Sequence, residues 1–230
     1  MRKLLCILTA VLVIGIAGCE FQCDKLFLDG FEADTLGNPP LLSPAGDPPN
    51  DSIALFGPSS AIEVIASPVT GTQAVALHRT AQGPLSAFEC ITVPGPHNSG
   101  KYSIAFQAYH RHIYIPPVMT VTVKSAAGER AFELLSNNGQ FRLRSGSGEE
   151  LLSVTYSVDV LHTVGITINF DTDRFSLDID NTDVADDKPF LDPGFSDLER
   201  LRFEFNPAIL EAFPGVYVVD NIMIFKITTS

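Results

Sequence analysis

The 230-residue sequence contains no tryptophan and only five tyrosines. Sugar-binding modules usually stack a sugar ring on one of these side chains, so the chain lacks an evident aromatic platform for that contact. Positive charge is also scarce, because 15 Lys and Arg stand against 27 Asp and Glu and give a formal net charge of −12. A chain this acidic is repelled by nucleic acid, which excludes nucleic acid as a partner.

Helical patterning is absent from the sequence as well. No segment keeps a helical period for long, and Pro207–Ala212 is the best candidate for a short helix. The longest apolar run, from Leu4 to Ala17, has about 14 residues, whereas a membrane-spanning helix needs about 20. Without an internal repeat, the rest of the chain is expected to form one domain.

The start of the chain has the pattern of an export signal. Arg2 and Lys3 precede the apolar run, and the small residues Ala17 and Gly18 lead directly into Cys19. This resembles the signal sequence and lipobox of bacterial lipoproteins, in which cleavage occurs before the cysteine and its sulfur is diacylated. More than one acyl chain makes such an attachment stable. Plain secretion and an uncleaved anchor are the alternatives.

The lipoprotein resemblance divides the chain into a signal peptide (1–18), a short lipidated tether (19–24) and a folded domain (25–230). It implies that the membrane is a partner through the lipid anchor at Cys19, and that the protein resides in the cell envelope. Glu20, which follows the cysteine, favours the outer membrane over the inner one. The face of the membrane stays open at this point.

Two cysteines, Cys23 and Cys90, remain once Cys6 has left with the signal and Cys19 carries lipid. An even pair in a compartment that permits disulfides predicts a bridge between them. Loop-closure entropy would give this bridge a stabilisation of about 4 kcal/mol. The alternative is one buried and one exposed thiol.

Alternating apolar and polar residues predict strands along most of the chain. Val164, Ile166 and Ile168 alternate with polar residues, and the alternation resumes after a turn at 171–174 with Phe175. Many short strands with polar outer faces predict an all-β fold, an antiparallel β-sandwich. The expected strands are 25–32, 53–56, 62–66, 73–79, 85–93, 102–112, 117–125, 130–135, 140–144, 150–155, 162–170, 174–180, 198–205 and 216–227.

The order of several motifs resembles the concanavalin A-like (laminin G-like) jelly-roll superfamily. These motifs are the opening Asp29-Gly30-Phe31-Glu32, the segment 71–77, the hairpin 162–180 and the closing segment 216–222. The resemblance covers roughly residues 25 to 230 and implies a jelly-roll sandwich. The superfamily includes lectins, carbohydrate-binding modules, glucanases and adhesive modules, so the resemblance implies an architecture more than an activity.

The same resemblance implies a structural calcium ion. Jelly-roll relatives often hold one where the first and last strands meet, and Asp29, Glu32 and Asp220 match those locations. Carboxylate oxygens are ligands that calcium prefers. Carboxylates that are held by hydrogen bonds to a neighbouring loop, with no metal, are the alternative.

No catalytic motif is assigned from the sequence. The superfamily's glucanases carry Glu-x-Asp-x-x-Glu on a strand, whereas Asp178 and Asp180 are followed by no glutamate, and Glu149 and Glu150 have the setting of loop charges. His110 and a histidine two residues later share a strand face on which zinc could bind, but a third ligand is missing. The chain is therefore expected not to be an enzyme.

A polar face opposite the core is the expected place for a ligand. It combines Thr120, Thr122, Lys124, Arg142 and Arg144 with Thr163, Thr167, Asn169, Ser176 and Asp178. The expected ligand contacts are Tyr109, Arg111, Tyr114, Arg142 and Arg144. The sequence thus predicts a non-catalytic, lipid-anchored envelope domain that binds a glycan or an envelope protein. A hydrolase directed at polysaccharide or peptidoglycan and a purely structural envelope protein are the alternatives.

Overall fold

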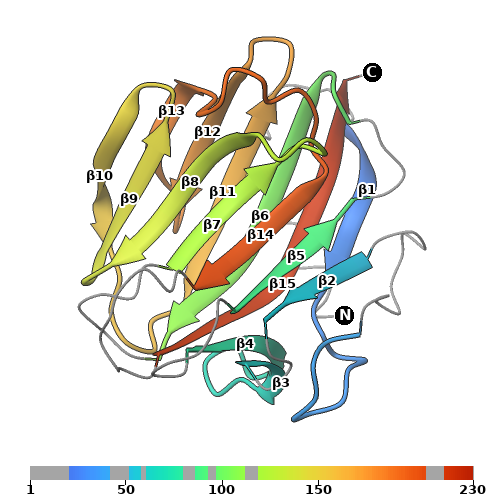
Figure 1. The fold of residues 1–230 in the computed structure, drawn as a ribbon, viewed down its shortest axis with the longest axis vertical. Coiled ribbons are helices and arrows are strands. Elements are labelled where there is room, and N and C mark those ends of the chain that lie inside the picture. The colour runs from blue at the N-terminus through green and yellow to red at the C-terminus, as the bar shows by residue number, and fades with distance from the viewer. Residues whose placement is uncertain are drawn as a thin grey trace.

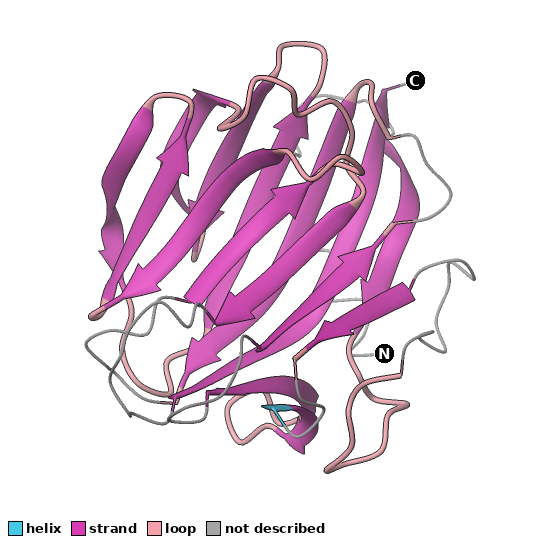
Figure 2. Ribbon diagram, viewed as in Figure 1, coloured by secondary structure: helices cyan, strands magenta, loops and turns pink. Residues whose placement is uncertain are grey.

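Two antiparallel β-sheets stack face to face in the computed structural model (Figures 1 and 2). The structure describes residues 21–41, 52–57, 61–79, 86–92, 97–111, 119–205 and 215–229. Nearly all regular structure in these ranges is strand, and none of it is α-helix. The predicted all-β antiparallel sandwich is confirmed, while the short helix expected at Pro207–Ala212 lies outside the described residues.

One sheet has eight strands and forms the rear layer in Figure 1. These strands are β1 (Phe21–Asp29), β3 (Ile62–Ala66), β4 (Gln73–Arg79), β6 (Lys101–His110), β11 (His162–Asn169), β12 (Arg174–Ile179), β13 (Thr182–Pro189) and β15 (Gly215–Thr229). Their order is β13-β12-β11-β6-β15-β4-β3, and β1 pairs with the second half of β15. The first half of β15 pairs with β4 instead.

The other sheet has seven strands and forms the front layer. They are β2 (Ser52–Phe56), β5 (Ser86–Ile91), β7 (Met119–Lys124), β8 (Arg130–Asn137), β9 (Gln140–Ser145), β10 (Gly148–Thr155) and β14 (Arg200–Phe205). Their order across the sheet is β10-β9-β8-β7-β14-β5-β2. Strands that are far apart in sequence, such as β7 and β14, are therefore neighbours.

The interior is built by the alternating apolar residues, with phenylalanines joining the layers. Phe106 of β6 meets Phe203 of β14 with ring centroids 5.0 Å apart, and Phe132 of β8 stacks on Phe175 of β12, also at 5.0 Å. All four rings are buried. Aromatic pairs at this separation stabilise a core beyond the area that they bury, so these contacts hold the two sheets together.

The β11–β12 hairpin follows the predicted alternation. Ile166 pairs with Leu177 in the register, and both side chains are buried. After β12 the chain reverses toward β13 at Asp180 and Asn181, whose φ angles of 54° and 60° are those of a tight turn. Two successive residues with positive φ define the turn type that matches the twist of the flanking strands.

Strand β13 was not among the predicted strands. It carries Asp183, Asp186, Asp187 and Pro189, residue types that are depleted in strands, and two register shifts interrupt its pairing with β12. Such a strand is stable at the edge of a sheet, where one side needs no partner. The sequence pattern is therefore one of an edge strand.

The amino-terminal part also differs from expectation. Strand β1 begins at Phe21 rather than Lys25, so residues expected in the tether pair with the end of β15, from Phe21 opposite Thr229 onward. Cys23 lies in this strand, and Cys90 is buried in β5. The disulfide between them stays a prediction, and so does the lipidation of Cys19, which lies outside the described residues.

Candidate functional site

Charged side chains gather on the outer face of the seven-stranded sheet. The strand register places Glu89, Arg202, Thr122, Glu133 and Arg144 in one row across β5, β14, β7, β8 and β9. With about 4.8 Å between neighbouring strands, the row is about 19 Å long. We call this surface the arginine–glutamate face; its charged members are Glu89, Lys124, Arg130, Glu133, Arg142, Arg144, Glu149, Arg200, Arg202 and Glu204.

Arg202 is the centre of the first cluster on this face. Its Nη1 donates to Glu89 Oε1 at 2.8 Å, and its Nε donates to Glu204 Oε2 at 2.5 Å. The side chain of Glu89 is only 3% exposed, while that of Glu204 is 26% exposed. Burial acts to lower the pKa of the Arg202 guanidinium. The hydrogen bonds to Glu89 and Glu204 outweigh this effect, so the pKa is raised. The guanidinium of Arg202 therefore stays charged.

An aromatic ring lies beside this cluster. The guanidinium carbon of Arg202 is 4.7 Å from the centre of the Phe56 ring, a distance at which cation–π attraction operates. Phe56 is 37% exposed on the edge strand β2. The face thus has an exposed aromatic ring next to two carboxylates, even though the chain contains no tryptophan.

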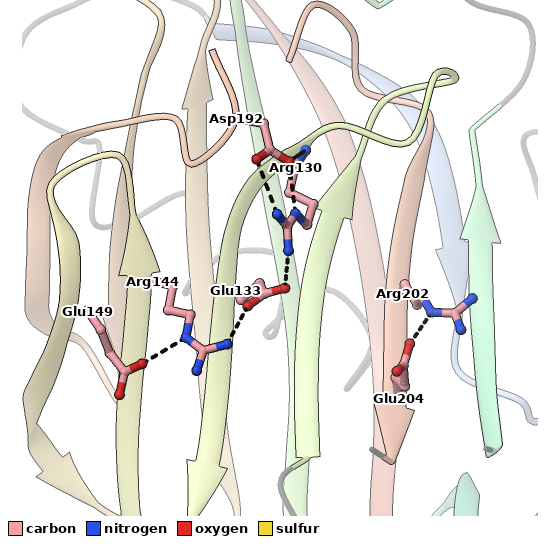
Figure 3. A network of polar contacts seen from close by, with 7 residues as sticks. All are labelled: Arg130, Glu133, Arg144, Glu149, Asp192, Arg202 and Glu204. Carbon is pink, nitrogen blue, oxygen red and sulfur yellow. Dashed lines mark hydrogen bonds and ion pairs between the residues drawn. The ribbon is translucent and has the colours of Figure 1, made fainter. Parts of the chain in front are cut away.

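The second cluster continues the row toward β10 (Figure 3). Arg130 binds Asp192 at 2.8 Å and Glu133 at 2.6 Å, and Arg144 binds Glu133 at 3.1 Å and Glu149 at 2.8 Å. Hydrogen bonds from Arg144 and then Arg142 lower the pKa of Glu149, although its burial acts in the opposite direction. Because carboxylates are shared between arginines, the arginine side chains are ordered across several strands.

A different polar group lies between the two sheets. His162 Nδ1 is 2.7 Å from Asp180 Oδ2, while the Nε2 atoms of His162 and His110 are buried without a hydrogen-bond partner. His110, His162 and Ser136 line one small cavity, which has room for about one water molecule. Since no hydrogen bond joins Ser136 to His162 Nε2, and no space exists for an ester, this Ser-His-Asp grouping is not an acyl-transfer site.

The structure does not bring the five expected ligand contacts together. Arg142 and Arg144 lie on the arginine–glutamate face, where both bind Glu149. Tyr109 belongs to β6 in the opposite sheet; it is 1% exposed, and its hydroxyl is 3.0 Å from Ser67 Oγ. Arg111 also follows β6, with its Nε 3.9 Å from Asp159, and Tyr114 lies outside the described residues.

Glu89, Arg202, Glu204 and Phe56 were not predicted as site residues. The alternation of Arg202 and Glu204 with buried Phe203 and Phe205 was available in the sequence and indicates an outward polar edge of β14. Their partner Glu89 is 113 residues away from Arg202 in the chain. Periodicity contains no information on which strands become neighbours, so the cluster was not visible.

The residues proposed for calcium are held by protein donors. Asp220, 1% exposed, accepts hydrogen bonds from Thr72 Oγ1 at 2.9 Å and from the Asn221 backbone amide at 2.7 Å. Glu32 accepts the Gln73 amide at 3.1 Å, and Asp29 accepts the Phe31 amide at 2.7 Å. Burial raises the pKa of Asp220, as does the nearby charge of Glu32.

These contacts favour structural carboxylates over metal ligands. Within the described ranges, no group of three or more His, Cys, Asp or Glu side chains has the arrangement of a metal site. His110, which was considered for zinc, points into the interior beside Tyr156 and Tyr217, and the second histidine lies in an undescribed segment. The calcium ion therefore remains an untested prediction, and no function is derived from it.

Comparison with solved structures identifies the architecture. A sialidase matches with a TM-score of 0.59 and 13% identity over 75% of this chain and 16% of the sialidase. A carbohydrate esterase from Shiga toxin-encoding bacteriophage phi24B matches with a TM-score of 0.58 and 12% identity, over 90% of this chain and 100% of the esterase. An alginate lyase from Corynebacterium sp. matches with a TM-score of 0.54 and 9% identity, over 76% of this chain and 83% of the lyase. This chain thus spans only a small part of the sialidase.

Other matching structures include a β-glucanase catalytic domain from Podospora anserina and botulinum neurotoxin type C, whose cell entry depends on interaction with two ganglioside molecules. No protein-family model matches the sequence, and no curated protein matches it either.

The expectation that the chain is not an enzyme is wrong by this comparison, because most of these neighbours are enzymes: an esterase, lyases, a glucanase and a sialidase. The sequence-based expectation relied on the absence of one strand motif and of a third ligand for a zinc site, and that motif is specific to one group of enzymes. The fold itself is confirmed as a jelly-roll sandwich, consistent with the concanavalin A-like superfamily.

Proposed function

We propose that this protein is a carbohydrate-active enzyme that hydrolyses a polysaccharide bound across the arginine–glutamate face. The observation that carries the proposal is the convergence of two carboxylates, Glu89 and Glu204, on the single guanidinium of Arg202. The enzymes of similar fold, which include a glucanase and alginate lyases, support a glycan as the substrate.

The positions of the two glutamates suit glycoside hydrolysis. Glu89 is directly opposite Arg202 in the register, and Glu204 is two residues further along β14. Diagonal partners of this kind are about 7 to 8 Å apart. Glycoside hydrolases place their two carboxyl groups about 5 to 9.5 Å apart, so Glu89 and Glu204 are within the working range.

The environments of the two glutamates suggest different roles. Glu89 is buried, with its carboxylate beside the guanidinium groups of Arg202 and Arg200, and we assign it as the base or nucleophile. Glu204 is the more exposed member, so its carboxyl group can reach the glycosidic oxygen and act as the acid. In the reaction, the acid protonates the leaving oxygen, and water supplies the hydroxyl of the new reducing end. Phe56 offers its ring to a neighbouring sugar.

Hydrolysis of a polysaccharide panel tests this proposal. The full chain in mild detergent is incubated with β-glucan, alginate, polygalacturonate and peptidoglycan, and new reducing ends are measured. Glu204→Gln and Glu89→Gln should each lower the rate at least about 100-fold, in the range expected for loss of a catalytic acid or base. Glu149→Gln, on the same face but outside the pair, is the matched control and should keep the rate within about twofold.

Circular dichroism melting shows whether each variant is folded. Release of no reducing ends from any substrate, or equal rates for Glu204→Gln and Glu149→Gln in folded proteins, would contradict the assignment. Glu204 is the decisive position, because its partial exposure makes the substitution less disruptive than one at the buried Glu89.

We also propose that the enzyme is attached to the cell envelope by lipid on Cys19. The support is the sequence pattern that ends in Ala17-Gly18-Cys19. In the described part of the structure, no helix is long and apolar enough to cross a membrane.

A further inference from the structure

Lys124 differs from the other cations of the arginine–glutamate face. Arg130, Arg142, Arg144, Arg200 and Arg202 each form an ion pair with a carboxylate. Lys124 forms no ion pair or side-chain hydrogen bond with any residue in the described ranges. The face therefore contains one positive charge that forms no ion pair with a carboxylate of the described residues.

The neighbours of Lys124 in the sheet add further positive charge around it. The register places Arg200 of β14 directly opposite Lys124 on one side and Arg130 of β8 on the other. Like charges in directly opposite positions are destabilising in a sheet. The carboxylates that act on Lys124, those of Glu89 and Glu204, are bound by Arg202 at 2.8 and 2.5 Å.

Partial burial makes the charge of Lys124 more costly. Burial lowers the pKa of the Lys124 ammonium, and the charge of Arg202 lowers it further, although Glu89 and Glu204 act in the opposite direction. An anion that bound here would remove this repulsion. The rest of the molecule repels anions, because the whole chain has a formal net charge of −12 and this one face holds six of its 15 Lys and Arg.

We propose that Lys124 binds the carboxylate of an acidic sugar, so that the polysaccharide cleaved at this face is anionic. This inference rests on the proposed function. Lys124 is opposite Arg200, and Glu204 is four residues further along β14, about 14 Å away. Lys124 thus contacts a different sugar from the one that is cleaved, and it determines specificity without taking part in the reaction.

Affinity and kinetics on paired substrates test the proposal. The full chain in mild detergent is compared on polygalacturonate and alginate, which are anionic, and on neutral β-glucan, by isothermal calorimetry and initial rates. Lys124→Met should weaken binding of an anionic polysaccharide at least 10-fold and raise its KM by a similar factor, with kcat changed less than twofold. Lys124→Arg should restore most of the affinity.

The matched control is Lys101→Met, an exposed lysine on β6 in the opposite sheet, which should change nothing. Lys124→Met should also fold at least as well as the native chain, because it removes a repelled charge. If the protein hydrolyses neutral β-glucan as well as anionic polymers and Lys124→Met has no effect, the acidic-sugar inference is overturned and the proposed function stands. If no polysaccharide is bound or cleaved, both fail.

Discussion

His110 shows what burial does to a single titratable residue in this sandwich. Its ring lies between Tyr156 and Tyr217, with centroids 4.2 and 4.7 Å away. Burial, and then the nearby His162, lower the pKa of His110 to about 3. The neutral imidazole is therefore the form that the folded protein contains at any physiological pH.

This shift predicts a pH-dependent stability. Below about pH 6.5 the unfolded chain takes up a proton at His110, whereas the folded protein does not until about pH 3. The contribution of His110 is thus complete above pH 6.5 and is lost as the pH falls toward 3. Urea unfolding at pH 7.5 and 4.5 should show a smaller loss of stability for His110→Phe than for the native chain. Equal losses would contradict the burial effect.

At the scale of elements, the β11–β12 hairpin contains a close contact between strands. Gly165 of β11 is directly opposite Asp178 of β12, and a Cβ atom at Gly165 would lie 2.2 Å from Asp178 Oδ2. The Asp178 carboxyl group therefore covers the glycine. Burial of the carboxyl group, followed by the nearby charge of Asp183, raises the pKa of Asp178.

Substitutions at this contact should be coupled. Gly165→Ala forces the Asp178 side chain away and should destabilise the protein by about 1 to 3 kcal/mol. In the background of Asp178→Ala, the same substitution should cost less than half as much, because the obstructing carboxylate is gone. A double-mutant cycle by urea unfolding measures the difference, and additive effects would show that the two positions are independent.

The same hairpin shows how far a sequence predicts elements. Alternation predicted β11 and β12 within two residues, and the turn between them, because each strand has one buried side. It failed for β13, where a polar edge strand has no apolar period. It also merged Thr120 and Thr163 into one polar face, although they belong to different sheets. An alternation with a period of two shows which side chains point away from the core. It does not show to which of the two sheets those side chains belong.

The candidate site failed to emerge from the sequence for the same reason. Arg142 and Arg144 were predicted because they alternate with Phe141 and Leu143 within one strand. The cluster of Glu89, Arg202 and Glu204 requires the pairing of β5 with β14, which only the folded sheet establishes.

For the whole molecule, the proposed lipid anchor is the main untested feature. Replacing Cys19 with Ala removes the sulfur to which lipid would be attached. The variant should leave the membrane fraction, and intact-mass measurement of the native mature protein should show the added acyl chains. A native protein without fatty acids, or a variant that stays with the membrane, would contradict the anchor.

The pairing of Phe21 with Thr229 has a practical consequence for work on this molecule. Both strands leave the sandwich at one corner, so a reporter fused after Ser230 would compete for space with whatever is joined ahead of Phe21. A label inserted in the turn at 170–173 avoids that corner, because it extends from the β11–β12 hairpin rather than from either terminal strand.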